Sequence, residues 1–176
     1  MSALSKHRIL LTGLPGCGKT TLIKSVADKI IVPAYGFYTQ EIRTAGRRAG
    51  FAIETFSTPP KKGVLSHIDI DSKYRVGKYG VDVDSFEKLA IPELEAGLDK
   101  QSLIIIDEIG KMELFSERFK NLLIQIFESE RSFLATIMYK PHPLCDKLKK
   151  MEGVEVITVT KWNREELFKE LYLNFS

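Results

Sequence analysis

The sequence predicts an α/β fold in which a mostly parallel β-sheet is covered by helices on both faces and carries an antiparallel β-rich insertion. Three observations lead to this prediction. Short, entirely apolar runs alternate along the chain with segments whose apolar residues recur at helical spacing. A glycine-rich loop joins the first of these runs to the first helical segment. Residues 36–83, by contrast, are rich in aromatic and β-branched residues separated by turn-forming sequence, which is typical of antiparallel strands.

The glycine-rich loop lies between a predicted strand at residues 8–12 and a predicted helix at residues 19–30, and it matches the pattern G-x-x-x-x-G-K-[ST]. With the residue that follows it, it gives the predicted nucleotide-binding set Gly13, Leu14, Pro15, Gly16, Cys17, Gly18, Lys19, Thr20 and Thr21. Backbone N–H groups of such a loop close around phosphates, and the helix N-terminus adds partial positive charge. Lys19 is expected to reach the β- and γ-phosphates, and the Thr20 hydroxyl to bind Mg²⁺. The loop and its context indicate a P-loop NTPase fold, and Cys17 is interpreted as a small filler.

The insertion at residues 36–83 is expected to contain four strands, at residues 36–43, 48–55, 64–70 and 74–81. The first two are predicted to form a β-hairpin closed by a four-residue loop at 44–47. The whole chain, residues 1–176, is expected to be a single domain that includes this insertion.

The second half of the chain alternates helices and strands, as a parallel sheet requires. They are expected at residues 85–98, 102–107, 116–129, 133–138, 143–151, 154–159 and 163–173. Asp84 with Glu87, and Asn163 with Glu166, have the spacing of capping boxes. Pro92 lies inside the first of these helices and is expected to kink or divide it.

Composition excludes several classes of protein. The chain has 44% hydrophobic and 28% charged residues, as soluble globular proteins do, and its net charge of +3 neither demands nor excludes nucleic acid. No apolar run approaches the roughly 20 residues that span a bilayer, and the polar N-terminus does not predict a signal peptide. Two cysteines, Cys17 and Cys145, are too few for a disulfide framework, which favours a cytoplasmic location. A monomer is favoured.

The predicted strand at residues 102–107 leads directly into two adjacent carboxylates, Asp107 and Glu108. In P-loop enzymes an acidic residue at such a strand end holds the Mg²⁺ shell, which is the role expected of Asp107. Glu108 is a candidate to orient and deprotonate the attacking water, the alternative being an acid on the surface. Asp107 to Gly110 also fits the D-x-x-G element of regulatory GTPases. However, the chain has no guanine-reading N-K-x-D sequence, and Lys111 stands where those proteins place a glutamine.

Phosphoryl transfer also requires positive charge near the γ-phosphate, and an arginine finger contributes about 10³- to 10⁵-fold in rate. The candidate residues are Arg43, Arg47, Arg48, Arg131 and Arg164, with Lys111 as an alternative. Thr136 is a candidate to sense the γ-phosphate or, alternatively, a buried threonine bonded to backbone. Trp162 is a candidate to stack on the base or, alternatively, to pack against the last helix.

The sequence from Asp107 to Ser116, DEIGKMELFS, resembles the signature of the THEP1-type nucleoside triphosphatases. Further matches lie at residues 36–39, 47–51, 76–82 and 86–90. The resemblance implies a RecA-like core and Mg²⁺-dependent hydrolysis of ATP, GTP, CTP and UTP to the diphosphate and phosphate. It also implies that residues 13–20 bind phosphates and that Asp107 and Glu108 form the metal-binding and water-activating pair. With Lys19, Glu108 is then an expected catalytic residue. Members often have an acidic residue where this chain has Gln40, so no role is transferred to that position.

Two alternative functions remain open from the sequence. The first is a kinase that transfers the γ-phosphate to a small molecule or a nucleic-acid end, with Arg43, Arg47 and Arg48 as its lid. The second is a nucleotide-dependent RNA-binding or assembly module whose contact surface is the same aromatic, basic hairpin. Nucleic acid is thus a possible partner that no specific motif supports.

Overall fold

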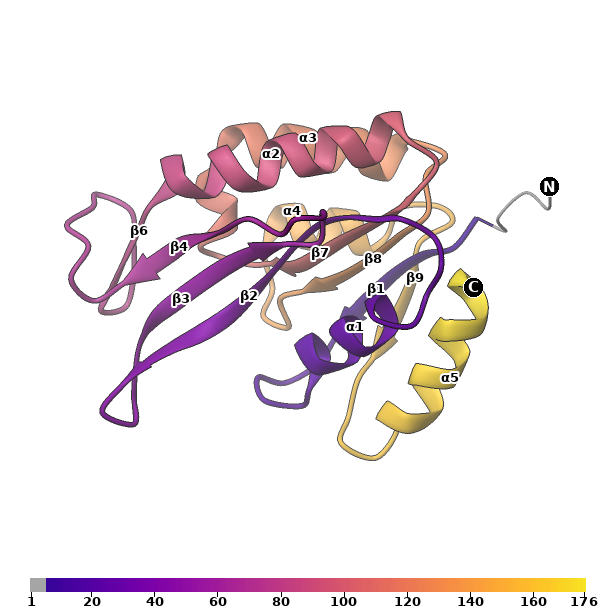
Figure 1. Ribbon diagram of the computed structural model, residues 1–176, viewed down its shortest axis with the longest axis horizontal. Coiled ribbons are helices and arrows are strands. Elements are labelled where there is room, and N and C mark those ends of the chain that lie inside the picture. The colour runs from indigo at the N-terminus through magenta and orange to yellow at the C-terminus, as the bar shows by residue number, and fades with distance from the viewer. Residues whose placement is uncertain (1–5) are drawn as a thin grey trace.

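The computed structural model describes residues 6–176 and contains one continuous β-sheet (Figure 1). Its strands are β1 (Arg8–Thr12), β2 (Ala34–Thr44), β3 (Arg47–Thr55), β4 (Lys62–His67), β5 (Arg75–Val76), β6 (Tyr79–Val81), β7 (Leu103–Ile109), β8 (Phe133–Ile137) and β9 (Glu155–Thr158). Its helices are α1 (Lys19–Ala27), α2 (Val83–Asp99), α3 (Glu117–Glu128), α4 (Pro143–Lys149) and α5 (Arg164–Phe175), with a 3₁₀ helix, η1, at Glu113–Phe115. Residues 1–5, on which the expectation of no signal peptide partly rests, lie outside the described range.

The strands are ordered β5-β6-β4-β3-β2-β7-β8-β1-β9 across the sheet. The pairs β2·β7, β7·β8, β8·β1 and β1·β9 are parallel, whereas the pairs from β2 outward to β5 are antiparallel. The predicted α/β class, with its mostly parallel core and antiparallel region, is confirmed. Strand β2 belongs to both parts, because residues 34–37 pair with β7 while residues 37–44 pair with β3. The antiparallel region therefore continues the central sheet.

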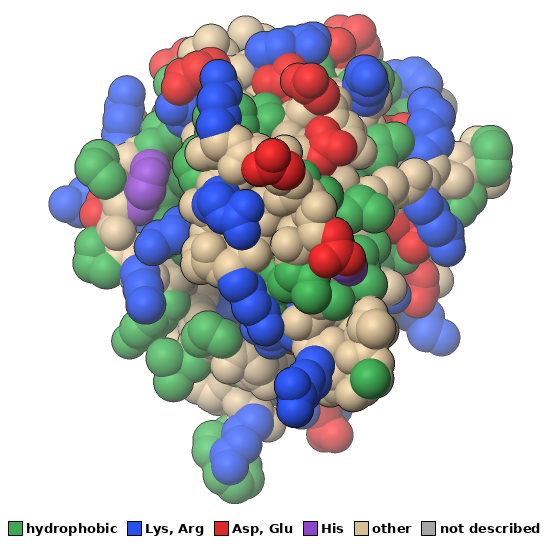
Figure 2. All heavy atoms as spheres, turned by 90° about the vertical axis from the view of Figure 1, so that its left-hand side faces the viewer, with side chains coloured by type: hydrophobic (Ala, Val, Ile, Leu, Met, Phe, Trp, Pro, Cys, Tyr) green, Lys and Arg blue, Asp and Glu red, His purple; other side chains and the backbone are tan. Residues whose placement is uncertain are grey.

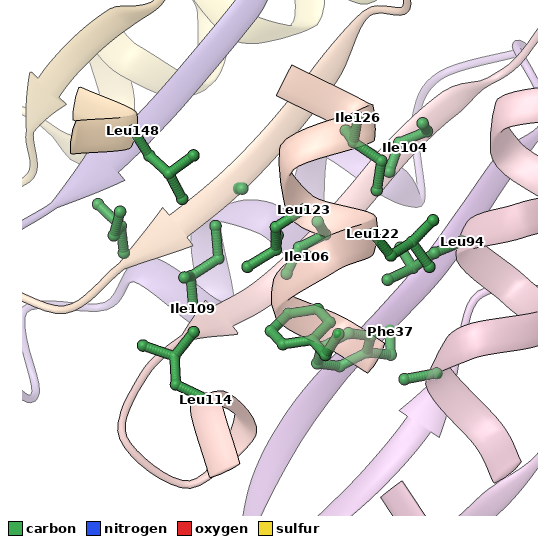
Figure 3. Close-up of a cluster of buried hydrophobic side chains, with 14 of the residues drawn as sticks. Phe37, Leu94, Ile104, Ile106, Ile109, Leu114, Leu122, Leu123, Ile126 and Leu148 are labelled. Atoms are coloured by element: carbon green, nitrogen blue, oxygen red, sulfur yellow. The ribbon is translucent and has the colours of Figure 1, made fainter. Parts of the chain in front are cut away.

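Helices cover both faces of the sheet, with α2, α3 and α4 on one side and α1 and α5 on the other (Figure 1). Alternate residues of one strand face opposite layers: Leu10 belongs to the core on the side of α2, α3 and α4, whereas Ile9 and Leu11 belong to the core on the side of α1 and α5. Figure 3 shows Ile104 and Ile106 of β7 among the leucines of α3. Burial on both faces explains why consecutive residues in the middle of these strands are apolar.

The antiparallel region differs from the prediction at two turns and at one strand end. The β2–β3 hairpin closes through Ala45 and Gly46 alone, so its loop has two residues rather than four. Both residues have positive φ, 49° and 75°, as two-residue hairpin turns require. The single strand predicted at residues 74–81 is instead a small hairpin, β5–β6, that turns at Gly77 and Lys78. The predicted strand at 64–70 ends at His67.

The helix boundaries also differ from the predictions. Helix α1 ends at Ala27, and α2 is capped by Asp82, whose side chain accepts a hydrogen bond from the Ser85 amide, rather than by Asp84. Helix α2 continues through Pro92 without being divided. Asn163 precedes α5 but makes no side-chain cap, so the capping box predicted there is wrong. Among the described residues, no helix combines the length and apolarity needed to cross a membrane.

Candidate active site

The predicted site residues meet at the carboxyl ends of three parallel strands, where ligands of open α/β sheets bind. The glycine-rich loop follows β1, and Asp107 lies near the end of β7. Strand β8 lies between those two strands and contributes Thr136, which is fully buried. One edge of the sheet therefore brings together residues that are almost 100 positions apart in the chain.

The loop forms an anion-binding site at the start of α1. Gly18 precedes the helix in the left-handed conformation, with φ 95°, and no side chain caps the helix. The first amides of α1 therefore have no side-chain acceptor and point toward the loop, where phosphate would bind. The ammonium of Lys19 is buried and donates hydrogen bonds to the carbonyls of Gly13, at 3.0 Å, and Leu14, at 3.2 Å. The loop thus combines free amides with a positioned positive charge.

Asp107 is buried, 2% exposed, beside this loop. Its Oδ1 atom accepts a hydrogen bond of 2.6 Å from the Thr136 hydroxyl. Its Oδ2 atom has no hydrogen-bond partner among the described residues, although the Thr20 hydroxyl lies close enough to favour the charged form. Burial raises the pKa of Asp107, while the two hydroxyls, the Lys19 charge and the Thr39 amide act in the opposite direction. Asp107 is therefore held in place through one oxygen, and the other is free to bind a cation.

The contact between Thr136 and Asp107 was not predicted by either reading of Thr136 from the sequence. The Thr136 hydroxyl donates to Asp107 and so fixes the orientation of the carboxylate, while a role in sensing the γ-phosphate stays a prediction. The side chain lies on a neighbouring strand, and only the β7–β8 pairing places it there.

Glu108 follows Asp107 across a cis peptide bond and is partly buried. Burial raises the pKa of Glu108, the Asp107 charge adds to the increase, and the Lys19 charge opposes it. A second acid, Glu113 of η1, also lies close to Gly110. A Cβ atom placed on Gly110 would lie 2.7 Å from Oε1 of Glu108 and 3.1 Å from Oε2 of Glu113. Both carboxyl groups therefore approach one small residue.

Glu113 was missed as a site residue in the sequence, where it was quoted only as part of a family signature. Glu113 is 5% exposed, and burial together with the Glu108 charge raises the pKa of its carboxyl group well above the ordinary value. The signal that marks it is local: an acid enclosed by Met112 and Leu114, in a short apolar segment between β7 and α3.

The raised pKa of Glu113 predicts that stability depends on pH. The unfolded carboxyl releases its proton near pH 4.5, whereas the folded one keeps it to a higher pH. The folded state then binds more protons than the unfolded state, so stability falls as the pH rises through this window. Glu113→Gln, which is neutral at every pH, is expected to show a shallower decline in melting temperature between pH 5 and pH 9. Glu95→Gln, on the exposed face of α2, is the control and should follow the wild type; equal slopes for all three proteins would contradict the prediction.

The candidate arginines occupy very different places. Arg43 and Arg48 both pair with Glu41 on the β2–β3 hairpin, where Arg48 also lies over the Phe51 ring. Arg47 is exposed at the same hairpin. Figure 2, which views the hairpin side of the molecule, shows Lys and Arg side chains spread over the face among hydrophobic and acidic ones. Arg131 precedes β8 and therefore lies at the amino ends of the parallel strands, opposite the loop.

Arg164, the first residue of α5, is the candidate that lies against the glycine-rich loop. A Cβ atom on Gly18 would lie 2.4 Å from its Nη1 atom. Lys111 is exposed beyond the end of β7. Trp162, two residues before Arg164, is 84% exposed and so does not pack against α5.

The chain is similar to known proteins over most of its length. A family model described as NTPase matches residues 8–172 of the chain. Nucleoside-triphosphatase THEP1 of Thermotoga petrophila is 43% identical over 164 residues, which cover 93% of this chain and 90% of that protein. Cancer-related nucleoside-triphosphatase of Homo sapiens is 39% identical over 184 residues, which cover 96% of this chain and 95% of the human protein.

Two solved structures resemble the fold. The crystal structure of THEP1 from the hyperthermophile Aquifex aeolicus matches with a TM-score of 0.87 at 40% identity, covering 96% of this chain and 99% of that one. The solution structure of a human cancer-related nucleoside triphosphatase matches with a TM-score of 0.79 at 37% identity, covering 96% of each chain. The matched family segment contains the loop, both adjacent carboxylates and Arg164.

Proposed function

The chain belongs to the THEP1-type family of nucleoside triphosphatases and is a nucleoside triphosphatase; from this premise we propose that it is Mg²⁺-dependent and accepts ATP, GTP, CTP and UTP alike. The products are the nucleoside diphosphate and phosphate. The observation that carries the proposal is the buried Asp107 carboxylate, fixed through Oδ1 and free at Oδ2 beside the phosphate-binding loop.

The residues beside the loop fit Mg²⁺. This ion prefers oxygen ligands and usually takes one or two carboxylates together with substrate phosphates. Asp107 Oδ2 and the Thr20 hydroxyl offer such oxygens next to the place where the β- and γ-phosphates would bind. In the described part of the chain, no group of three or more His, Cys, Asp and Glu side chains could hold a metal by itself. We expect the ion to enter with the nucleotide, where it neutralises phosphate charge.

Glu108 is proposed as the residue that orients the attacking water and takes its proton. Its raised pKa, caused first by burial, is what a general base needs to operate near neutral pH. Lys19 and the amides of α1 supply positive charge to the phosphates, and Arg164 is placed to add to it. The residues that act on the water and on the phosphates would thus lie at the ends of neighbouring strands of one sheet.

Broad tolerance of the base follows from where the binding energy arises. The loop is expected to hold phosphates through backbone amides and one lysine, and these contacts do not depend on which base the nucleotide carries. The sequence contains no N-K-x-D element to read guanine. We therefore expect similar maximal rates with all four nucleotides.

Phosphate release from ATP, GTP, CTP and UTP, with Mg²⁺ and with EDTA, tests this proposal. All four nucleotides should be hydrolysed with Mg²⁺, and EDTA should remove the activity because Asp107 then has no ion to hold at the phosphates. Activity that persists in EDTA would contradict the assignment of Asp107. Turnover that appears only with an added nucleoside or polynucleotide acceptor would identify a kinase instead.

A further inference from the structure

We propose that the groove between α1 and α5 binds the nucleoside end of the substrate, and that Trp162 stacks on the base and gives purine nucleotides the tighter binding. This inference rests on the proposed function, because it concerns the part of the same nucleotide that the loop does not hold. It assigns a role to Trp162, which the hydrolytic site leaves unused.

The groove has the size of a small-molecule site and adjoins the loop through Arg164, which lines it and lies against Gly18. Its volume is about 630 Å³, within the roughly 300–1,000 Å³ of such sites. Thr21 and Ser25 of α1 form one wall, and Arg164 and Phe168 of α5 form the other. Thr21 directly follows Thr20, so the groove begins where the phosphate site ends.

The order of groups in a nucleoside triphosphate determines which part reaches this groove. Lys19 and Thr20 are the residues expected at the β- and γ-phosphates and their metal. The α-phosphate and nucleoside must then leave the loop, and Thr21 leads from the loop into the groove. Arg164 lies against Gly18 and also lines the groove, so its guanidinium lies where the phosphate-binding loop meets the groove.

The charge of the groove favours an anionic ligand. Four cations line it against two carboxylates, namely Lys29, Lys161, Arg164 and Lys169 against Asp28 and Glu165. A nucleotide carries its charge at the loop end and an uncharged aromatic base at the other, which matches a groove with Arg164 near the loop and Trp162 in its lining.

The loop between β9 and α5 holds Trp162 in a fixed backbone conformation. The Asn163 side chain accepts a hydrogen bond from the Thr160 amide at 2.8 Å and donates one to the Thr158 carbonyl at 2.9 Å. The Trp162 amide in turn donates to the Thr160 hydroxyl at 3.3 Å. Its indole ring is 84% exposed, with the Lys161 ammonium 4.6 Å from the ring centroid. A large apolar ring held in water beside a nucleotide site is suited to cover a base, which would remove both surfaces from solvent.

Stacking sets the size of the expected effect. Base–aromatic stacking contributes about 1–3 kcal/mol per base, so loss of the ring should weaken binding by roughly tenfold. A purine presents a larger ring surface than a pyrimidine, so a purine nucleotide should lose more binding affinity when the Trp162 ring is removed. Inorganic triphosphate has no base, so its binding affinity should be unchanged.

Tryptophan fluorescence tests the contact directly, because Trp162 is the single tryptophan of the chain. The full chain is titrated in Mg²⁺ with non-hydrolysable ATP and UTP analogues and with inorganic triphosphate. The ATP analogue should quench the emission strongly, the UTP analogue less, and inorganic triphosphate should leave it unchanged. Equal responses to all three ligands, or none to the ATP analogue, would overturn the inference.

Calorimetric binding to variants provides the second measurement. Trp162→Ala should raise the Kd of the ATP analogue roughly tenfold, that of the UTP analogue less, and leave that of triphosphate unchanged, while Trp162→Phe should recover part of the loss. Leu173→Ala, which removes an exposed apolar side chain of α5 that does not line the groove, is the matched control and should bind like the wild type. An unchanged Kd in Trp162→Ala would also overturn the inference. Phosphate release without a fluorescence response would defeat the inference alone, whereas a response without release would defeat the proposed hydrolysis alone.

Discussion

Glu108→Gln is expected to bind nucleotide with the affinity of the wild type and to release phosphate about 10²- to 10⁴-fold more slowly. The amide has the shape of the carboxyl group but cannot accept a proton from water. Lys19, Thr20 and Asp107, which are expected to hold the phosphates and the metal, remain intact. Binding is measured by calorimetry with a non-hydrolysable analogue, and turnover by phosphate release at saturating nucleotide.

The matched control for Glu108→Gln is Glu95→Gln, the same change on the exposed face of α2. It should leave both binding and turnover unchanged. Full turnover in Glu108→Gln would show that another group activates the water. A loss of binding equal to the loss of turnover would place Glu108 in ligand binding instead.

Gly36→Ala is expected to destabilise the fold by roughly 3–5 kcal/mol, a large part of the stability of a typical domain. Gly36 lies where β2 pairs with β7, and its φ of 128° is rarely adopted by residues with a side chain. A Cβ atom there would lie 1.8 Å from the Ile105 carbonyl oxygen, which belongs to the neighbouring strand and cannot move without breaking the sheet. Urea denaturation followed by circular dichroism measures the change.

Gly46→Ala separates the two causes of this destabilisation. Gly46 also has positive φ, 75°, but a Cβ atom on it would have no atom within 4 Å. The Gly46→Ala variant should therefore lose only about 1 kcal/mol of stability, the cost of placing a residue with a side chain in this conformation. An equal loss in the two variants would mean that the approach of β2 to β7 is looser than the structure indicates.

The sequence was sufficient to predict the class of fold and to nominate candidate site residues, because both depend on local patterns. Uniformly apolar strands indicated a sheet covered on both faces, and the loop at residues 13–20 needed only its flanking strand and helix. The adjacent carboxylates Asp107 and Glu108 were recognised for the same reason. Membership of the THEP1-type family, expected from residues 107–116, is confirmed.

The contacts that the sequence did not reveal depend on strand order. The Thr136–Asp107 hydrogen bond requires β8 to lie beside β7, and the position of Arg164 requires α5 to return to the start of α1. Likewise, the sequence could not rank the five candidate arginines, because only the strand arrangement shows that Arg131 lies at the amino ends of the parallel strands, away from the loop. The roles of the loop, Asp107 and Glu108 in catalysis remain predictions that the variants above test.

The position of β8 also has a consequence for how the protein is made. Residues 13–20 and 107–108 leave the ribosome before β8 does, yet β8 lies between β1 and β7 and pairs with both. A growing chain that ends before Phe133 therefore carries both halves of the site without the strand that joins them. Since a ligand stabilises only the form that binds it, nucleotide can protect the finished chain but not this precursor. We therefore expect nucleotide binding to begin only after β8 has joined β1 to β7, with Arg164 of α5 added later still.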